Sequence, residues 1–389
     1  MRLAYIIDSM AFKGGAERII SEKMNELSAD DSYCIYLITC YQFPDETPNT
    51  YYISEKVRQI HLQIPVHRQY KYHYPRRLWE KWRYHHLLSQ KLSKTIDSIQ
   101  PDIIVGVGYT LADVVCSIPC QAKKVIESHE ARHFTMSNVL YRERSPLSKM
   151  FVGIYRKIYL RTIEKKASVV VCLTREDAID WQKAHRVEVI PNFSTMQVTA
   201  ISSGTSKRVI AVGRLEWQKG YDKLIRIWKN VYTRHPNWQL DIYGEGTLKN
   251  ELQTQIQQEQ VSNITIHPFT DNISKEYANS SICVLTSRFE GFSLVLLEAM
   301  RHGVPCVTFD CPYGPSGVVD NGKNGYVIEN DNIELFAEKL SELMEHPETR
   351  KSFSEMAIVK AKIFDKEVIM RQWKSLFESF LKEYSSTHS

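Results

Sequence analysis

Several features that would point to other protein classes are missing from this chain of 389 residues. It contains no run of about 18 apolar residues, and its most apolar stretch, 103–118, is interrupted by Gly106, Gly108 and Asp113, which argues against a membrane-spanning helix. The apolar run at 1–8 is too short for a signal peptide and is expected to form a first strand.

Cysteine usage gives no sign of a disulfide framework. The eight cysteines form no C-x-x-C pair, and several lie in apolar, strand-like runs, where a cysteine behaves as a small hydrophobic residue. This pattern favours a reducing cytoplasm as the location of the protein. The cysteines in such runs are Cys34, Cys172, Cys283 and Cys306.

The composition is that of an ordinary soluble globular protein. Hydrophobic residues make up 43% and charged residues 24% of the chain, and the formal net charge is +5. This charge is too small to indicate nucleic-acid binding by itself, and no nucleic-acid reader motif accompanies it.

Short apolar runs alternate with helical patterns throughout the chain, which predicts parallel sheets built from βαβ units in two halves. A Ser/Gly/Thr cluster at 202–206 is typical of a linker. We therefore expect an N-terminal domain at 1–193, a C-terminal domain at 206–364 and a final helical segment at 365–389. Strands are predicted at 2–8, 33–39, 57–62, 102–107, 123–127, 168–173, 187–190, 208–212, 238–243, 263–267, 281–285, 305–309 and 326–328.

The segment from Arg288 to Met300 places two glutamates eight positions apart. Glu290 lies in the loop after a predicted strand, and Glu298 lies in the second turn of a helix for which Ser293 is a plausible N-cap. A helix N-terminus attracts phosphate, and at about 1.5 Å per residue Glu298 lies about 6 Å further along the axis. A phosphate at the helix start and a ribose beside Glu298 are compatible with this layout.

Two cations lie on the loop that follows the first strand of the second half. In Gly213-Arg214-Leu215-Glu216-Trp217-Gln218-Lys219-Gly220, Arg214 can bind phosphate oxygens bidentately and Lys219 adds a point charge. The alternative is an ordinary solvated loop. The position at the carboxyl end of a strand favours a ligand site.

These two segments resemble the E-x7-E and G-R-x-x-x-x-K-G elements of the family-4 retaining glycosyltransferases, and 189–192 resembles the family's V-I-P-N element. The resemblance implies a GT-B fold, in which two Rossmann-like α/β domains face each other across a cleft and the C-terminal helix crosses back to the N-terminal domain. It also implies that Arg214 and Lys219 hold the donor diphosphate, that Glu290 faces the donor sugar and that Glu298 holds the ribose.

The resemblance assigns further residues to the donor site. Phe269 stands where backbone groups meet the base, and Ser293 and Leu294 are placed to offer backbone amides to phosphate. Gly14 and Gly15 correspond to a Gly-rich loop near the donor phosphates, although a plain strand-to-helix turn is an equal alternative for them.

His129 follows the predicted strand at 123–127 and matches a family histidine that approaches the donor sugar. The same residues also spell H-E-x-x-H, from His129 through Glu130 to His133, which is the pattern of zinc proteases. Its position after a strand and the absence of an evident third ligand disfavour zinc. No D-x-D motif occurs, and we expect neither a metal ion nor another cofactor.

The sequence departs from the family at Gly317. In the segment 311–319, Gly317 stands where some members carry a glutamate, so any role of that glutamate is in doubt in this chain.

Two basic segments, 67–94 and 142–166, carry interleaved aromatic and apolar residues. They suit an anionic membrane surface or a lipid-linked acceptor, and a plain solvated face is the alternative.

Together with these features, the resemblance implies a retaining glycosyltransferase that acts in cell-surface polysaccharide synthesis. The donor is expected to be a nucleotide-sugar, and a UDP-sugar in particular, that supplies a hexose or N-acetylhexosamine. The acceptor is expected to be a saccharide or a polyprenyl-linked or other lipid-linked saccharide. We expect the protein in the cytoplasm, with contact to the inner face of the membrane as an open alternative. Two alternative functions are considered. The first is a twin-Rossmann dinucleotide-dependent oxidoreductase, which is disfavoured because no G-x-G-x-x-G fingerprint occurs. The second is a non-catalytic module that binds a saccharide or a lipid.

Overall fold

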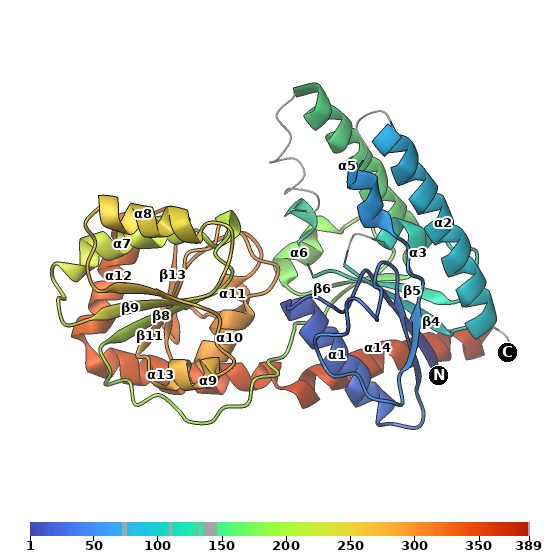
Figure 1. The fold of residues 1–389 in the computed structure, drawn as a ribbon. Helices are drawn as coiled ribbons and strands as arrows, with labels where there is room; N and C mark the ends of the chain where they lie inside the picture. Colours follow the sequence, from blue (N-terminus) through green and yellow to red (C-terminus); the bar gives the residue numbers. More distant parts are fainter. Residues whose placement is uncertain (72–75, 109–110, 130, 135–145, 388–389) are drawn as a thin grey trace. The chain divides into compact units, whose positions relative to one another are not determined.

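A computed structural model describes residues 1–71, 76–108, 111–129, 131–134 and 146–387. The chain forms two compact α/β units (Figure 1). Unit 1 comprises Met1–Ile190 together with Met370–Ser389, and unit 2 comprises Pro191–Ile369. Each unit is built on one sheet in which every pair of neighbouring strands is parallel. The prediction of parallel α/β domains is confirmed.

The sheet of unit 1 has the strand order β3-β2-β1-β4-β5-β6-β7. Its strands are Val/Ile-rich and mostly buried, as expected for a sheet covered by helices on both faces. The strands are β1 (Arg2–Ile7), β2 (Cys34–Thr39), β3 (Arg58–His61), β4 (Ile103–Val107), β5 (Lys123–Glu127), β6 (Val169–Cys172) and β7 (Val187–Val189).

One face of this sheet shares a hydrophobic core with α2, α3 and α5, and α1 and α14 lie on the other face (Figure 1). Short 3₁₀ segments, η1 and η2, complete the unit. The elements are α1 (Gly15–Ser28), η1 (Val66–Lys71), α2 (Arg76–Ile99), α3 (Ala112–Ser117), η2 (Arg132–Phe134), α5 (Pro146–Lys166), α6 (Arg175–Asp180) and α14 (Lys366–Thr387).

The sheet of unit 2 has the strand order β10-β9-β8-β11-β12-β13. Counted within the unit, this is the 3-2-1-4-5-6 order of a Rossmann fold, so the order reverses between β8 and β11. The strands are β8 (Arg208–Val212), β9 (Gln239–Tyr243), β10 (Ile264–His267), β11 (Ile282–Leu285), β12 (Cys306–Phe309) and β13 (Gly325–Ile328).

Helices α7, α8 and α12 share one hydrophobic core with this sheet, whereas α10 packs against α13 on the other side (Figure 1). The helical elements are η3 (Trp217–Lys219), α7 (Tyr221–Tyr232), α8 (Lys249–Gln258), α9 (Ile273–Ala278), α10 (Leu294–Arg301), α11 (Pro315–Val318), α12 (Ile333–Glu345), α13 (Pro347–Ala361) and η4 (Lys362–Phe364).

The Ser/Gly/Thr cluster that the sequence suggests as a linker is bound to unit 2. The Ser202 amide donates to the carbonyl of His302 (2.8 Å), and the Ser202 hydroxyl donates to the carbonyl of Ser280 (2.5 Å). Because these bonds fix the extended segment, the boundary between the units lies earlier, between Ile190 and Pro191.

The last helix, α14, returns to unit 1 and is held there by polar and aromatic contacts. Lys374 pairs with Asp30 (3.1 Å), and the hydroxyl of Ser379 accepts a hydrogen bond from Arg186 (3.1 Å). The Trp373 ring covers the ammonium group of Lys23 in α1. Of the helices in the described ranges, none is long and apolar enough to cross a bilayer.

Candidate active site

The loops after β8 and β11 lie at the point in unit 2 where the strand order reverses. In open parallel sheets, ligands bind at the carboxyl ends of the strands at this switch point. The loop after β8 carries Arg214 and Lys219, and the loop after β11 carries Glu290 and leads into α10. Arg214, Lys219 and Glu290 therefore follow neighbouring strands.

The structure brings Lys219 and Glu290 together although they are 71 positions apart in the sequence. The ammonium Nζ of Lys219 lies 2.7 Å from Oε1 of Glu290, and the hydroxyl of Ser287 donates to the same oxygen at 2.5 Å. The side chains of Lys219 and Glu290 are only 14% and 8% exposed. An ion pair with so little exposure is held in a defined geometry.

The two loops are joined by a set of bonds that the sequence analysis did not foresee. The Arg288 amide donates to the carbonyl of Gln218 (2.7 Å), and the Gln218 side chain donates to the carbonyl of Phe289 (3.0 Å). The guanidinium of Arg288 also makes two hydrogen bonds to Asp222 (2.9 and 2.6 Å) and stacks over Trp217. Burial alone would raise the pKa of Asp222, but the hydrogen bonds and charge of Arg288 lower it below 3.8.

Gly220 allows this close approach of the loops. Its φ of 63° lies in the left-handed region, and a Cβ atom there would lie 2.2 Å from the carbonyl oxygen of Thr286. The Thr286 hydroxyl in turn donates to the carbonyl of Gly220 (3.1 Å). A side chain at this position would separate the loops that carry Lys219 and Glu290.

Arg214 extends from the same loop and is exposed. Its closest hydrogen-bond partner among the described residues is the side chain of Gln218, at 3.5 Å, which is the outer limit of a hydrogen bond. A guanidinium with so weak a partner can rotate to bind an anion without losing an existing ion pair.

The start of α10 has unsatisfied donors. No described residue accepts a hydrogen bond from the amides of Val295 or Leu296, and the buried hydroxyl of Ser293 also has no partner among the described residues. The Leu294 amide, which the sequence analysis favoured, already donates to the carbonyl of Phe292 (3.0 Å). Free amides at a helix N-terminus bind phosphate well.

Glu298 lies in the second turn of α10 and is buried. The hydroxyl of Tyr277 lies 3.4 Å from its carboxylate, and burial together with the charge of Glu298 raises the pKa of Tyr277 well above 10. Phe269 lies on the loop after the edge strand β10 and is more than half exposed.

The loop after β12 borders Glu290. The Glu290 amide donates to the carbonyl of Pro312 (3.3 Å), and a Cβ atom on Gly314 would lie 2.8 Å from the Cβ of Glu290. Gly317 lies in α11 and its amide donates to the carbonyl of Gly314 (3.2 Å).

The predicted residues of unit 1 lie on separate loops. Gly14 and Gly15 follow β1, and His129 follows β5, which is two strands away in the sheet. Gly14 is the N-cap of α1, and the carboxylate of Glu17 approaches so closely that a Cβ on Gly14 would lie 2.0 Å from it. A phosphate at this helix start would have to compete with that carboxylate.

His129 lies beside a buried charged pair. Its Nε2 is 3.2 Å from Oε1 of Glu127, and the ammonium of Lys23 binds the same carboxylate. Burial would raise the pKa of Glu127, but the charges of Lys23 and His129 hold it at about 2. The imidazole is thereby fixed at the carboxyl end of β5.

The zinc-protease pattern does not form the helix that such a site needs. His129 lies in a loop, His133 lies in the short 3₁₀ segment η2 and is exposed, and Glu130 lies outside the described residues. In the described part of the chain, no group of three or more His, Cys, Asp and Glu side chains is placed to hold a metal ion.

The two basic segments are only partly described, since Tyr72, Tyr74, Arg142 and Glu143 lie outside the described residues. In the first segment, Trp79 and Trp82 are exposed on α2. Exposed apolar side chains of the second segment lie on α5 and are Met150, Ile154, Tyr155 and Ile158.

Comparison with known proteins relates most of unit 2 to a described family. Residues 197–360 match the family described as "Glycosyl transferases group 1". This stretch contains Arg214, Lys219, Glu290 and Glu298. Residues 197–360 of unit 2 are therefore similar to a glycosyltransferase group 1 domain. The family resemblance predicted from the sequence is confirmed.

Two relatives extend this finding. The chain is 35% identical over 170 residues to the amylovoran biosynthesis glycosyltransferase AmsD of Erwinia amylovora, a match that covers 43% of this chain and 47% of AmsD. It is 30% identical over 236 residues to a poly(ribitol-phosphate) alpha-N-acetylglucosaminyltransferase of Staphylococcus aureus, covering 58% of this chain and 48% of the relative. The chain thus matches about half the length of each.

The fold is that of GT-B glycosyltransferases. A mutant of TarM from S. aureus, solved with Fondaparinux, alpha-GlcNAc-glycerol and UDP, superposes with a TM-score of 0.74 at 16% identity, covering 97% of this chain and 99% of TarM. The predicted fold class is confirmed, and these comparisons do not favour the oxidoreductase.

Proposed function

We propose that the protein is a retaining glycosyltransferase that transfers a hexose or N-acetylhexosamine from a UDP-sugar to a saccharide or lipid-linked acceptor during synthesis of a cell-surface polymer. The observation that carries the proposal is the Lys219–Glu290 pair at the switch point of unit 2, with Arg214 and the free amides of α10 beside it. Cations and helix amides complement a diphosphate, and the paired carboxylate complements a sugar.

In the proposed reaction, the bond between the anomeric carbon and the diphosphate oxygen breaks, and a bond to the acceptor oxygen forms on the same face of the sugar. Negative charge grows on the leaving diphosphate, where Arg214, Lys219 and the start of α10 would stabilise it. The acceptor proton passes to a diphosphate oxygen. Glu290 would orient the donor sugar and stabilise positive charge on its ring. His129 would orient the sugar, and no metal ion is required in this scheme.

The names of the relatives support the substrate classes. AmsD is named for the biosynthesis of amylovoran, and the name of the S. aureus relative describes transfer of N-acetylglucosamine in an alpha linkage. UDP-N-acetylglucosamine carries an alpha bond, so an alpha product formed from that donor requires retention. A TarM structure contains UDP. For an acceptor on a membrane, the basic segments 67–94 and 142–166 would provide contact with anionic lipid.

The donor site can be tested by thermal shift. We expect UDP at about 100 times its dissociation constant to stabilise the wild-type protein by about 2.7 kcal/mol, and Glu298→Gln to lose most of that response because a neutral amide binds ribose hydroxyls less strongly than a carboxylate. The measurement is the shift in melting temperature with UDP, GDP, NAD or zinc.

Glu251→Gln is the matched control, since Glu251 is exposed on α8 of the same unit. Its response to UDP should equal that of the wild type. Stabilisation by NAD or zinc without a response to UDP or GDP would reject the proposal, and an unchanged response in Glu298→Gln would reject the assigned ribose site. Release of UDP from a UDP-sugar would distinguish an enzyme from a binding module.

A further inference from the structure

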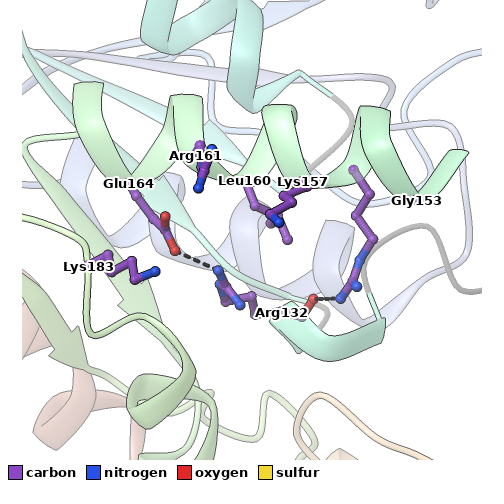
Figure 2. A pocket seen from close by; sticks show the side chains of 8 residues that line it. Arg132, Gly153, Lys157, Leu160, Arg161, Glu164 and Lys183 are labelled. Carbon is purple, nitrogen blue, oxygen red and sulfur yellow. Dashed lines mark hydrogen bonds and ion pairs between the residues drawn. The ribbon is translucent and has the colours of Figure 1, made fainter. Parts of the chain in front are cut away.

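Unit 1 contains a basic pocket that the proposed donor chemistry does not use. It has a volume of about 300 Å³ and lies between α5, η2 and the segment after α6 (Figure 2). This volume is at the lower end of the range for small-ligand sites. Five cations line it against a single carboxylate, Glu164. The cations are Arg132, Arg156, Lys157, Arg161 and Lys183.

Two of the arginines are held in place by the protein. Arg132 binds Glu164 at 2.6 Å and lies over the Trp181 ring, with 5.1 Å between the guanidinium carbon and the ring centroid. Arg156 donates to the carbonyls of Arg132 (2.9 Å) and His133 (2.6 Å). These bonds fix both guanidinium groups before any ligand arrives, which lowers the entropic cost of binding an anion.

The other three cations have no carboxylate partner. Within the described ranges, no side chain or backbone oxygen forms an ion pair or hydrogen bond with Lys157, Arg161 or Lys183. Lys157 and Arg161 are four positions apart on α5, where like charges repel. Among the residues that line the pocket, Glu164 is the one carboxylate, and Arg132 already binds it. An anion in the pocket would relieve this repulsion.

An exposed apolar stripe runs beside the pocket on α5. Met150, Ile154 and Ile158 recur every four residues and are 52%, 50% and 60% exposed. Ile154 lies three positions before Lys157, and Ile158 lies three positions before Arg161. The apolar stripe and these pocket cations therefore occupy adjacent rows of one helix. An apolar row beside a cationic pocket complements a ligand with an alkyl or isoprenoid chain and an anionic head.

We infer that this pocket binds the phosphate of a lipid-linked ligand, with the lipid chain lying along Met150, Ile154 and Ile158. Phosphate suits the site because arginine guanidinium groups bind its oxygens bidentately and lysines add point charges. The identification of this ligand as the sugar acceptor rests on the proposed function, whereas the affinity for a lipid phosphate does not.

Vesicle co-sedimentation tests the inference on the full chain. The probes are phosphatidylcholine vesicles that contain either phosphatidate or a sulfated glycolipid at equal surface charge. We expect tighter binding to phosphatidate, and Arg161→Gln/Lys183→Gln should weaken it roughly thirty-fold, since each basic residue near an anionic surface contributes roughly a fivefold factor in affinity. Ile154→Ser/Ile158→Ser should weaken it as well.

Two matched variants serve as controls. Lys207→Gln/Lys382→Gln removes two exposed lysines outside the pocket and should bind as the wild type does, and Arg161→Lys/Lys183→Arg keeps the charge and should retain binding. Equal binding to the sulfated lipid, or wild-type binding by Arg161→Gln/Lys183→Gln, would show a plain basic surface and overturn the inference. If soluble glycerol phosphate competes with the vesicles and Ile154→Ser/Ile158→Ser binds as the wild type does, the phosphate that the pocket binds does not come from a lipid.

The thermal shift with UDP separates this inference from the proposed function. The pocket variants should keep the wild-type response to UDP, because they change unit 1 only. A protein that binds phosphatidate through the pocket but never responds to UDP would contradict the donor site and leave the pocket assignment standing.

Discussion

Replacing Lys219 by glutamine should slow the release of UDP from a UDP-sugar by roughly a hundred- to a thousandfold. The reason is electrostatic: the leaving diphosphate gains negative charge in the transition state, and the loss of one preorganised donor to such a charge typically costs a factor of this size. The buried position of Lys219 strengthens the effect, because water cannot replace the lost ammonium. The measurement is the rate of UDP release at saturating donor.

Glutamine is chosen because its amide can still donate to Glu290, so the bond between the two loops persists. Lys323→Gln is the control, since Lys323 is exposed in the same unit. A Lys219→Gln rate within tenfold of the wild type would show that Lys219 serves only to hold Glu290.

Glu290→Gln tests the other half of the pair: if Glu290 stabilises charge on the sugar ring, the rate should fall while UDP binding is retained.

Replacing Lys23 by methionine should destabilise unit 1 by about 3–5 kcal/mol, because it removes the ammonium that pairs with the buried carboxylate of Glu127. Both side chains of this pair are only 1% exposed, and Trp373 of α14 covers the ammonium. The pair therefore links α1, β5 and α14. Hydrogen exchange should accelerate most in α1 and in α14 from Met370 onward, and the midpoint of unfolding in urea should fall.

The double variant Lys23→Met/Glu127→Leu should recover most of the lost stability, since replacing both members of a buried ion pair by apolar residues is often close to neutral. Lys56→Met is the control, because its pairing with Asp31 lies at the surface and should leave the midpoint unchanged. Equal effects of Lys23→Met and Lys56→Met would contradict the structural role of the buried pair.

The same pair predicts a loss of stability in acid. The folded-state pKa of Glu127 is about 2, below the ordinary 4.5, so the carboxylate contributes stability that is fully present above about pH 4.5 and is lost as the pH falls towards 2. Unfolding of unit 1 followed between pH 5 and pH 2 should show this loss, and a Glu127→Gln variant should show a smaller dependence on pH. Identical pH profiles would contradict the assignment.

Much of the fold could be read from the sequence because buried parallel strands are continuous apolar runs. The predicted strands at 208–212 and 281–285 correspond to β8 and β11 within one residue, and Glu298 falls in the second turn of α10 as its spacing predicted. The unit boundary was harder to place. A Ser/Gly/Thr cluster looks like a linker, yet Ser202 is bound to His302 and Ser280 by hydrogen bonds that no local pattern encodes.

The site was predictable in its charged residues but not in the bonds that orient them. Arg214, Lys219 and Glu290 stand out because of their residue types and their place after strands. Ser287 and Arg288 were missed as site residues, since a serine and an arginine in a loop carry no distinctive local signal. The only hint was their position between a strand and a helix start, next to Glu290.

The sequence by itself determined the alternation of strands and helices, the two α/β halves and the resemblance of residues 213–220 and 290–298 to glycosyltransferase elements, because these depend on local periodicity and spacing. Only the tertiary structure decided that Lys219 lies 2.7 Å from Glu290, that Lys23 is buried against Glu127 and Trp373, and that Arg132, Arg161 and Lys183 line one pocket. Such contacts join residues that are tens to hundreds of positions apart, and they form only when the order of strands in the sheet brings those segments together.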